Sequence, residues 1–474
     1  MTHGPTADGP TNNAGPLSGG AGQPGRPTGM PDAALPGIPD ANAPQPSPGG
    51  GQPQRATNEK PRTEQAPAGR GGSTSPERAA VPTPQTPPVS APAAPAPPSG
   101  NLSEVLLGSI GTSSGIIGRA VQPTRDGAKA WVADINARGG LAGHPVRVVF
   151  GDDGGDPGRA LSLARQMVEQ QRVTAFYAFT AATTGQAIYP YIEGKNIPVL
   201  SSCDCNNADD ASPMVFNTGP GTTVGLAWAH FLPAIDFYPQ KKKLGVMYCA
   251  EAPICPAIHD IIRKVAPQAG YQVVWSAQAS MAQPDYTAEI IAARNAGVEV
   301  FTSIAEGTTL IRVVRSAKRQ GWAPTFVTQF AAADESVIKA GGSDLEGVLL
   351  AQSGPNWMTS PKMADYRAAM DRYVPNGISG GIGVHPWTAG KVLEYLAPKF
   401  FSKATVTTED ILNGLYSIDG ETFGGLLPPT KWAKGRGHWD TNLCLVASRI
   451  KDQKLETARG DETFTCAPGW KKPD

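Results

Sequence analysis

A strand, a helix and a second strand over residues 105–150 limit the architectures that this chain can adopt. Apolar residues recur at helical spacing over 128–135, so a helix buries one face there. Gly139 and Gly140 end this helix, because glycine readily takes the left-handed backbone of a helix exit. β-branched runs at 105–110 and 146–150 suit strands buried on both faces. A right-handed crossover then makes the two strands parallel neighbours.

The alternation of short apolar runs and amphipathic segments continues to residue 200 and starts again after Gly221. It predicts an α/β fold of two Rossmann-like lobes with parallel central sheets, joined by multiple hinge crossings. We expect residues 101–220 with about 353–417 in lobe 1, and residues 221–352 with about 418–470 in lobe 2.

Local signals predict three helices. Asp156 before Pro157 is an N-cap followed by proline at the first helical position. A helix is expected over 222–237, and Thr407 with Asp410 three residues later resembles a capping box. A loop is expected at 111–118.

Composition separates the first 100 residues from the rest of the 474-residue chain. They hold half of the 46 prolines and no Phe, Trp or Tyr. Such a segment buries too little apolar surface to offset chain entropy, so residues 1–100 are predicted to be a disordered Pro/Gly-rich tail or tether.

Charge and hydropathy exclude two classes of partner. Lys plus Arg equals Asp plus Glu at 41 each, which does not indicate nucleic acid. No window of 18 apolar residues occurs, so no transmembrane segment is predicted in this chain. The first 30 residues also lack the basic start and apolar core of a secretion signal.

The cysteines nevertheless favour an oxidising compartment, since their number is even and all lie in the predicted folded part. Six cysteines allow 15 pairings, and the sequence alone does not choose among them. Short separations favour Cys249 with Cys255 and Cys444 with Cys466, which leaves Cys203 and Cys205.

Motifs for enzymatic chemistry are mostly missing from the sequence. It lacks a G-x-G-x-x-G turn, a G-x-x-x-x-G-K-[ST] loop and a G-x-S-x-G elbow, so neither a nucleotide cofactor nor a hydrolase nucleophile is indicated. Cys203, Asp204, Cys205, and Cys255 with His259, offer soft ligands without the local spacing of a zinc site. We therefore expect no catalytic residue, no metal and no cofactor. The six histidines are scattered, which suits surface or core roles.

Polar loops at the carboxyl ends of the strands are the remaining candidate site, because ligands of open α/β sheets bind there. Helix N-termini in such loops can hold an anionic group through backbone amides. The loops are 111–118, 179–184, 201–206, 249–255, 305–309 and 329–334.

The stretch D-I-N-A-R-G-G-L-A-G-H-P-V-R-V-V at 134–149, with Asp153 and Asp156-Pro157, resembles the type I periplasmic binding proteins, and especially their leucine/isoleucine/valine-binding branch. Stretches 196–202, 215–218 and 315–321 are similar to later segments of that family. The resemblance covers roughly residues 103–420. It implies a solute receptor that feeds an ABC permease and closes its lobes on a small amino acid or related compound.

Family positions carried over residue by residue imply ligand contacts from both lobes. Lobe 1 would hold a ligand carboxylate, and lobe 2 would bind the amino group and side chain. The implied ligand-binding residues are Thr180, Thr183, Ser202, Cys203, Asp204, Glu251, Glu306, Phe330 and Trp387. Five of them have a structural alternative: helix capping for Thr180 and Thr183, a helix-dipole contact for Glu306, and core packing for Phe330 and Trp387. Asp204, between two cysteines, has no such structural explanation and would pair with a cationic ligand group.

The sequence therefore predicts an extracytoplasmic, periplasmic or cell-surface, solute-binding protein of an ABC importer that performs no chemistry. One alternative is a cytosolic amide or amino-acid sensor of the same fold that regulates a partner protein. Another is an α/β hydrolase or metalloenzyme that uses the loop at 203–210.

Overall fold

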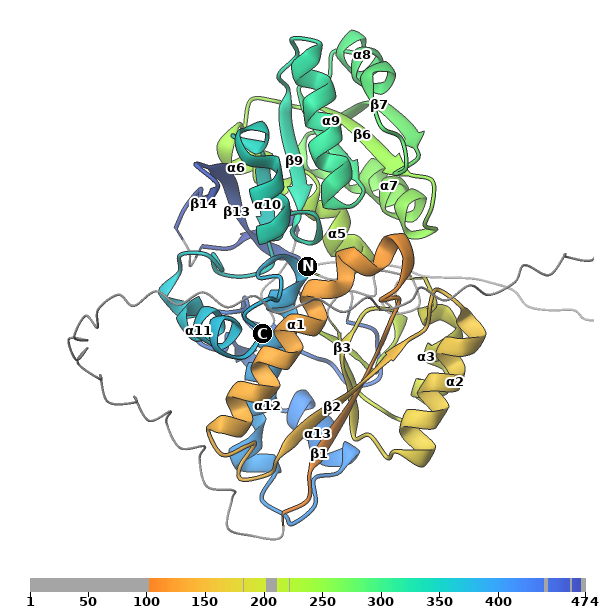
Figure 1. Ribbon diagram of the computed structural model, residues 1–474, viewed down its shortest axis with the longest axis vertical. Coiled ribbons are helices and arrows are strands. Elements are labelled where there is room, and N and C mark those ends of the chain that lie inside the picture. Colours follow the sequence, from red (N-terminus) through yellow and green to blue (C-terminus); the bar gives the residue numbers. More distant parts are fainter. Residues whose placement is uncertain are drawn as a thin grey trace, which may run out of the picture. The chain divides into compact units, whose positions relative to one another are not determined.

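The computed structural model describes residues 102–181, 183–201, 211–220, 222–438, 442–460 and 463–469. The chain divides into two compact units, 1–87 and 88–474, and all described residues belong to the second. This second unit contains two sheets of mainly parallel strands, with helices on both faces of each (Figure 1). The predicted α/β class with parallel central sheets is confirmed. The expected tail at 1–100 lies outside the described residues.

The first sheet has five strands among the described residues, and all of its ladders are parallel. Its order is β2-β1-β3-β4-β5. The strands are β1 (Val105–Gly111), β2 (Val146–Asp152), β3 (Ala175–Phe179), β4 (Val199–Ser201) and β5 (Val215–Asn217). Parallel pairing brings their carboxyl ends to one edge, so the loops that follow β1, β2 and β3 are neighbours there.

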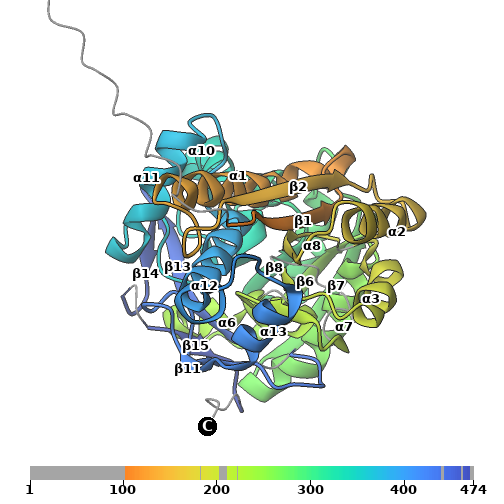
Figure 2. The same ribbon diagram turned by 90° about the horizontal axis from the view of Figure 1, so that it is seen from below.

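Helices cover both faces of this sheet (Figure 2). They are α1 (Gly115–Ala137), α2 (Pro157–Arg165), α3 (Gly185–Gly194), α11 (Ala364–Tyr373), α12 (Val384–Phe400) and α13 (Thr408–Tyr416). On the α1 and α12 face, Trp131 packs against Tyr177 at 5.2 Å between ring centroids. On the α2 and α3 face, Phe176 packs edge-on against Phe179. β3 thus supplies two separate apolar cores, with Tyr177 and Ala178 in one and Phe176 and Phe179 in the other. The register shift between Tyr177 and Phe179 breaks the strict alternation of faces.

The second sheet has the order β14-β13-β10-β9-β8-β6-β7, with β15 paired to β13. Its strands are β6 (Lys243–Cys249), β7 (Gln272–Ala279), β8 (Val300–Ile304), β9 (Thr325–Gln329), β10 (Leu349–Gln352), β13 (Cys444–Lys451), β14 (Lys454–Thr457) and β15 (Thr465–Cys466). β6 to β10 run parallel, whereas β13, β14 and β15 join antiparallel at one edge. A two-stranded ribbon, β11 (Asp419–Glu421) with β12 (Thr430–Lys431), stands apart from both sheets.

The helices of the second sheet include one that the sequence predicts wrongly. They are α5 (Thr223–Ala229), α6 (Leu232–Phe237), α7 (Ile254–Val265), α8 (Thr287–Asn295), α9 (Gly307–Arg319) and α10 (Glu335–Gly341). The single helix expected over 222–237 is two helices that meet at His230 and Phe231. Pro233 explains the break, because it has no N–H to donate to the carbonyl of Ala229, and its ring would clash with that carbonyl in a continuous helix.

Short 3₁₀ and π turns complete the described elements. They are the π turn η1 (Gln166–Gln170) and the 3₁₀ turns η2 (Ala266–Ala269), η3 (Phe330–Ala332), η4 (Gly342–Leu345), η5 (Pro361–Met363) and η6 (Gly381–Gly383).

Helix α1 begins inside the stretch 111–118 that we expected to be a loop. Gly115 opens it, and the helix continues through Pro123. The sequence hides this start because two glycines and a proline normally argue against helix. The extension carries the first turns of α1 beyond the sheet edge, toward the second sheet (Figure 1).

We call the first sheet with α1–α3 and α11–α13 the first lobe, and the second sheet with α5–α10 the second lobe. The chain leaves the first lobe after β5, returns after β10 and leaves again before β13, which confirms multiple crossings. Trp432, just after the ribbon, packs against Phe216 of the first sheet at 5.5 Å between ring centroids. The lobe boundaries inferred from the sequence stay a prediction.

Two predicted helix caps are confirmed. Asp156 accepts a 2.6 Å hydrogen bond from the backbone N–H of Arg159 at the start of α2. Thr407 and Asp410 form a reciprocal capping box at the start of α13.

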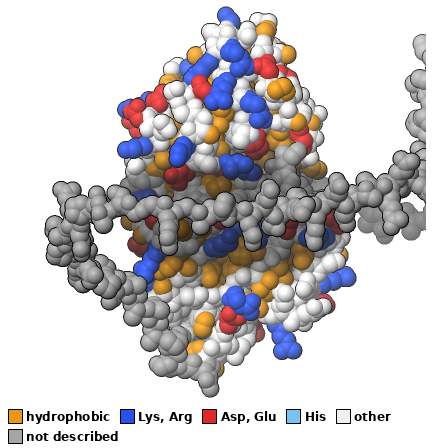
Figure 3. Space-filling view, in the orientation of Figure 1, with side chains coloured by type: hydrophobic (Ala, Val, Ile, Leu, Met, Phe, Trp, Pro, Cys, Tyr) orange, Lys and Arg blue, Asp and Glu red, His pale blue; other side chains and the backbone are white. Residues whose placement is uncertain are grey.

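On the face shown in Figure 3, Lys and Arg side chains are scattered among acidic and uncharged ones.

Candidate functional site

A cavity of about 160 Å³ lies where loops of the two lobes meet, and we call it the central cavity. The second lobe contributes α5, the start of α7, and the segments after β6, β8 and β9. The first lobe contributes α1, the loop after β3, and η6. The apolar lining includes Val121, Leu226, Ile254, Ile258, Ile304 and Ile382. The cavity thus occupies the strand ends at which open α/β sheets bind ligands.

The size of the central cavity limits what can fill it. An apolar cavity of about 150 Å³ can hold a benzene ring in another protein. At about 160 Å³ this cavity has room for the side chain of leucine or phenylalanine. Four polar side chains also reach its lining, namely Thr183, His230, Glu306 and Gln329.

A buried carboxylate organises the first-lobe side of the site. Asp153 follows β2 and is fully buried. Its Oδ1 accepts hydrogen bonds from the Thr112 hydroxyl at 2.7 Å and the Gly155 N–H at 2.8 Å. Its Oδ2 accepts from the Thr184 hydroxyl at 2.7 Å. One carboxylate therefore ties together the loops after β1, β2 and β3. The sequence marks Asp153 only as part of the family resemblance.

The same network fixes the direction of the Thr183 hydroxyl bond. Thr112 and Thr183 hydroxyls lie 3.1 Å apart. A hydroxyl has one proton, and Thr112 gives its proton to Asp153, which can only accept. Thr183 is therefore the donor to Thr112, and its oxygen offers only lone pairs to the cavity. This arrangement suits a ligand group that donates hydrogen bonds.

Glu306 lies on the second-lobe side as the N-cap of α9. Its Oε1 accepts from the hydroxyls of Thr308 and Thr309 and from the Thr309 N–H, each at 2.7 Å. Its Oε2 accepts from the Thr308 N–H at 2.6 Å and keeps a lone pair for a further donor. Burial alone would raise the pKa of Glu306, but these hydrogen bonds bring it below its usual value. Glu306 is thus an anion at neutral pH.

His230, which the sequence does not single out, also lines the central cavity. It is the C-cap of α5, and its Nδ1 lies 2.7 Å from the carbonyl oxygen of Leu226. Because a carbonyl only accepts, Nδ1 carries the proton, and Nε2 is an acceptor with no partner among the described residues. The break between α5 and α6 puts the imidazole at this position, so Pro233 is the sequence signal that could have found it.

Two other predicted ligand residues lie outside the lining. Thr180 is buried and forms an isolated parallel bridge with Gly111 at the end of β1. Glu251 accepts hydrogen bonds from the Ser280 hydroxyl at 2.6 Å and the Met281 N–H at 2.7 Å. Glu251 therefore links the loop after β6 to the loop after β7. The ligand contacts inferred for both residues stay predictions.

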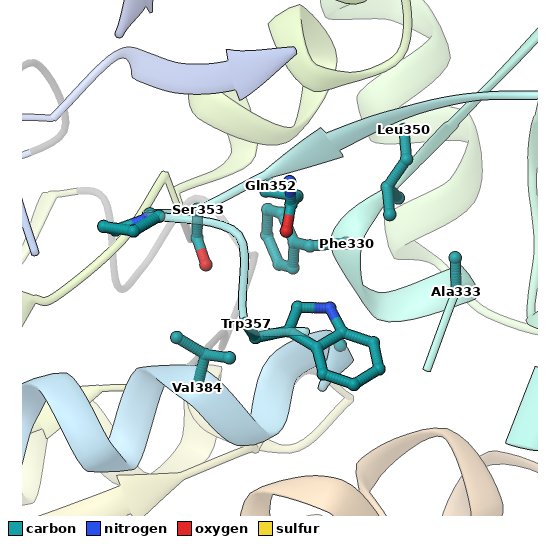
Figure 4. Close-up of a pocket in the computed structure, with 10 residues that line it drawn as sticks. Phe330, Ala333, Leu350, Gln352, Ser353, Trp357 and Val384 are labelled. Carbon is teal, nitrogen blue, oxygen red and sulfur yellow. The ribbon is translucent and has the colours of Figure 1, made fainter. Parts of the chain in front are cut away.

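The two aromatic side chains predicted to contact the ligand pack in the core, and their ligand contacts stay predictions. Phe330 packs against His385 at 4.7 Å between ring centroids and lines a cavity of about 10 Å³ with Gln352 and Trp357 (Figure 4). This space is about that of one water molecule. Trp387 is 1% exposed and packs edge-on against Tyr366. Neither ring lies in the lining of the central cavity.

Two predicted disulfides are present, Cys249–Cys255 and Cys444–Cys466. The first lines the central cavity, whereas the second joins β13 to β15. Ser202, Cys203, Asp204 and Cys205 lie outside the described residues.

A second, more polar space of about 340 Å³ adjoins the central cavity. The two share Ala120, Met281, Glu306 and Ala331 as lining residues. The second space is also lined by Arg119, Thr308, Arg312 and Asp334. A ligand in the central cavity can therefore extend from an apolar interior to a charged rim.

Within the described residues, no group of three or more His, Cys, Asp or Glu side chains could hold a metal ion. A search of the same residues finds no helix with the length and hydropathy needed to cross a membrane.

The model of the periplasmic binding protein family matches residues 104–454, which is most of the chain. The chain therefore belongs to the periplasmic binding protein family. It is also similar to an amino acid binding protein of Pseudomonas aeruginosa, with 23% identity over 254 residues that cover 52% of this chain and 67% of that protein.

Solved structures agree in fold. A branched-chain amino acid ABC transporter protein of Thermus thermophilus, solved with bound valine, has a TM-score of 0.66 and 18% identity over 77% of this chain and 97% of its own. A fatty acid ABC transporter substrate-binding protein of Thermomonospora curvata has a TM-score of 0.63 and 17% identity over 78% and 93%. At such identities the likeness shows the type I periplasmic binding fold alone.

Proposed function

We propose that this protein is the solute-binding component of an ABC importer and captures a small amino acid with an apolar side chain. The observation that carries the proposal is the central cavity, which has an apolar interior and two acceptors at its edge, Thr183 and Glu306. The ligand's side chain would fill the interior, and its ammonium group would meet the anionic Glu306 and the lone pairs of Thr183.

The location proposed for this activity is outside the cytoplasm. Both described disulfides support it, because such bonds persist in oxidising compartments. The solved structures described above support an ABC permease as partner, since both belong to ABC transporters. Binding would occur by closure of the lobes, with no chemical change in the ligand.

The experiment compares leucine with 4-methylpentanoate, which keeps the apolar body and carboxylate but lacks the amino group. Leucine is expected to raise the melting temperature and to bind at least about tenfold more tightly, because a charged hydrogen bond is worth roughly 1.5–3 kcal/mol. Glu306→Gln is expected to remove most of that preference. Isothermal titration measures both ligands on both proteins.

Asp156→Asn is the matched control, because it makes the same carboxylate-to-amide change at the N-cap of α2, away from the cavity. Equal affinity for leucine and 4-methylpentanoate would contradict the amino-group assignment. A product formed from leucine, detected by mass spectrometry, would contradict solute binding without chemistry.

A further inference from the structure

One part of the wall of the central cavity comes from a short segment that a disulfide closes. Cys249 and Cys255 are bonded to each other across a separation of six residues. Five lining residues come from this segment and the helix that it starts, namely Cys249, Ala252, Ile254, Cys255 and Ile258. The two half-cystines are 2% and 5% exposed, so the bond is itself part of the buried wall.

A second contact holds the same segment. The Glu251 carboxylate accepts from the Ser280 hydroxyl and from the N–H of Met281, which also lines the cavity. Burial would raise the pKa of Glu251, but these hydrogen bonds lower it overall, so the carboxylate is ionised at neutral pH. The wall is thus fixed to the end of β6 by the disulfide and to the loop after β7 by Glu251.

We propose that the Cys249–Cys255 disulfide is a positioning element for the ligand cavity, so that reduction of this bond weakens ligand binding and ligand binding resists its reduction. The inference rests on the proposed function. A wall that is fixed before binding does not have to be ordered by the ligand, and that ordering otherwise lowers affinity. With the bond open, residues 250–254 lose one of the two side-chain links described here, and the Glu251 contact remains.

The redox step balances with an added dithiol as reductant. One dithiothreitol thiolate attacks a sulfur of the disulfide, and the other cysteine leaves as a thiolate and takes a proton. The second dithiothreitol thiol loses its proton and attacks the dithiothreitol sulfur of this mixed disulfide, which closes the oxidised ring and releases the attacked cysteine as a thiolate that takes a proton. Two protein thiols and one oxidised dithiothreitol result. Thermodynamic linkage is reciprocal. If the disulfide raises ligand affinity by some factor, the bound ligand lowers the equilibrium constant for reduction of the disulfide by the same factor.

The second disulfide of the same lobe serves as a control for the experiment. Cys444–Cys466 is also a disulfide of the second lobe, but it lies between β13 and β15 and does not line the central cavity. Cys444 is buried, like both cysteines of the cavity pair, whereas Cys466 is partly exposed. A general loss of stability after removal of a disulfide therefore appears in both variants. A change in ligand affinity is expected in only one.

The experiment titrates valine, leucine and phenylalanine into the wild type, a Cys249→Ser/Cys255→Ser variant and a Cys444→Ser/Cys466→Ser variant. The first variant is expected to bind the best of the three amino acids about tenfold more weakly, which is the effect of ordering one or two side chains. The second is expected to bind as the wild type does. Equal affinity in all three proteins overturns the inference and leaves the proposed function intact.

A measurement on the wild type avoids dependence on variants that fail to fold. The protein is equilibrated with dithiothreitol buffers with and without the same amino acid, its thiols are alkylated, and mass spectrometry of peptides quantifies each pair separately. A tenfold effect lowers the potential of Cys249–Cys255 by about 30 mV and leaves that of Cys444–Cys466 unchanged. An unchanged potential for Cys249–Cys255 overturns the inference. If none of the three amino acids binds the oxidised wild type, the proposed function and this inference both fail.

Discussion

At the scale of single residues, His230 is the side chain whose protonation is most sensitive to its surroundings in the central cavity. Its ring is 1% exposed, and burial lowers its pKa to about 4, although the hydrogen bond to Leu226 opposes this shift. In the unfolded chain the same imidazole titrates near 6.5. Between these two values the unfolded state binds a proton that the folded state does not.

This difference predicts a pH dependence of stability. The contribution of neutral His230 to the free energy of unfolding is complete above pH 6.5. It is lost progressively as the pH falls from 6.5 through about 4. Across that window it amounts to about 3 kcal/mol, at 1.36 kcal/mol per pH unit. His230→Phe is expected to remove this part of the acid destabilisation. Urea unfolding of both proteins at pH 7 and pH 4.5 measures it, and parallel losses in the two proteins would refute it.

At the scale of elements, the sequence predicts what local chemistry decides. Alternating apolar periodicities predict the order of strands and helices, and the caps at Asp156 and Thr407 follow from residue spacing. The two described disulfides also follow from short separations. These features depend on neighbours in the chain, which a sequence displays directly.

Features that depend on distant partners could not be predicted in this way. The antiparallel β13 is added to a parallel sheet through pairing with β10, about 95 residues earlier in the chain. The role of Asp153 requires three loops to converge, and the position of His230 requires α5 to end beside α7 and η6. The sequence indicates Thr183 and Glu306, which line the central cavity, and includes Gln329 only as part of the loop 329–334, whereas it does not single out His230.

The capping box of α13 gives a prediction at this scale. Thr407→Ala removes the side chain that accepts from the Asp410 N–H and also contacts the Asp410 carboxylate. The free energy of unfolding is expected to fall by about 1 kcal/mol. Thr405→Ala is the control, because Thr405 is exposed and lies two residues before the cap. Chemical denaturation measures both, and an equal effect of the two changes would contradict the capping role.

At the scale of the whole described unit, the lobes are joined by contacts beyond the chain crossings. Arg119 of α1 donates to the hydroxyl of Ser336 in α10, which in turn donates to Asp334. Nearby, the Glu335 N–H donates to the Ser379 carbonyl at 3.0 Å. These contacts lie beside the polar space next to the central cavity. Because they join the two lobes, we expect them to favour an arrangement in which the lobes are closed on each other.

Ser336→Ala is therefore expected to weaken leucine binding without loss of stability. Removal of one hydrogen bond across the lobes shifts the balance toward the open form, and a net bond of 0.5–1.5 kcal/mol corresponds to about two- to tenfold in affinity. Ser162→Ala is the control, since that hydroxyl bonds within α2. Isothermal titration and urea unfolding test the prediction. Unchanged affinity in Ser336→Ala would show that this contact does not contribute to closure.

The Asp153 network has a consequence for how ligand preference can change. Three loops of the first lobe converge on one carboxylate, so alteration of any of them disturbs the other two. The side chains at 252, 254 and 258 do not join separate loops in this way, since they contribute apolar surface from one segment. Redesign of the cavity for a different ligand should therefore begin with substitutions in that segment and leave the three loops around Asp153 unchanged.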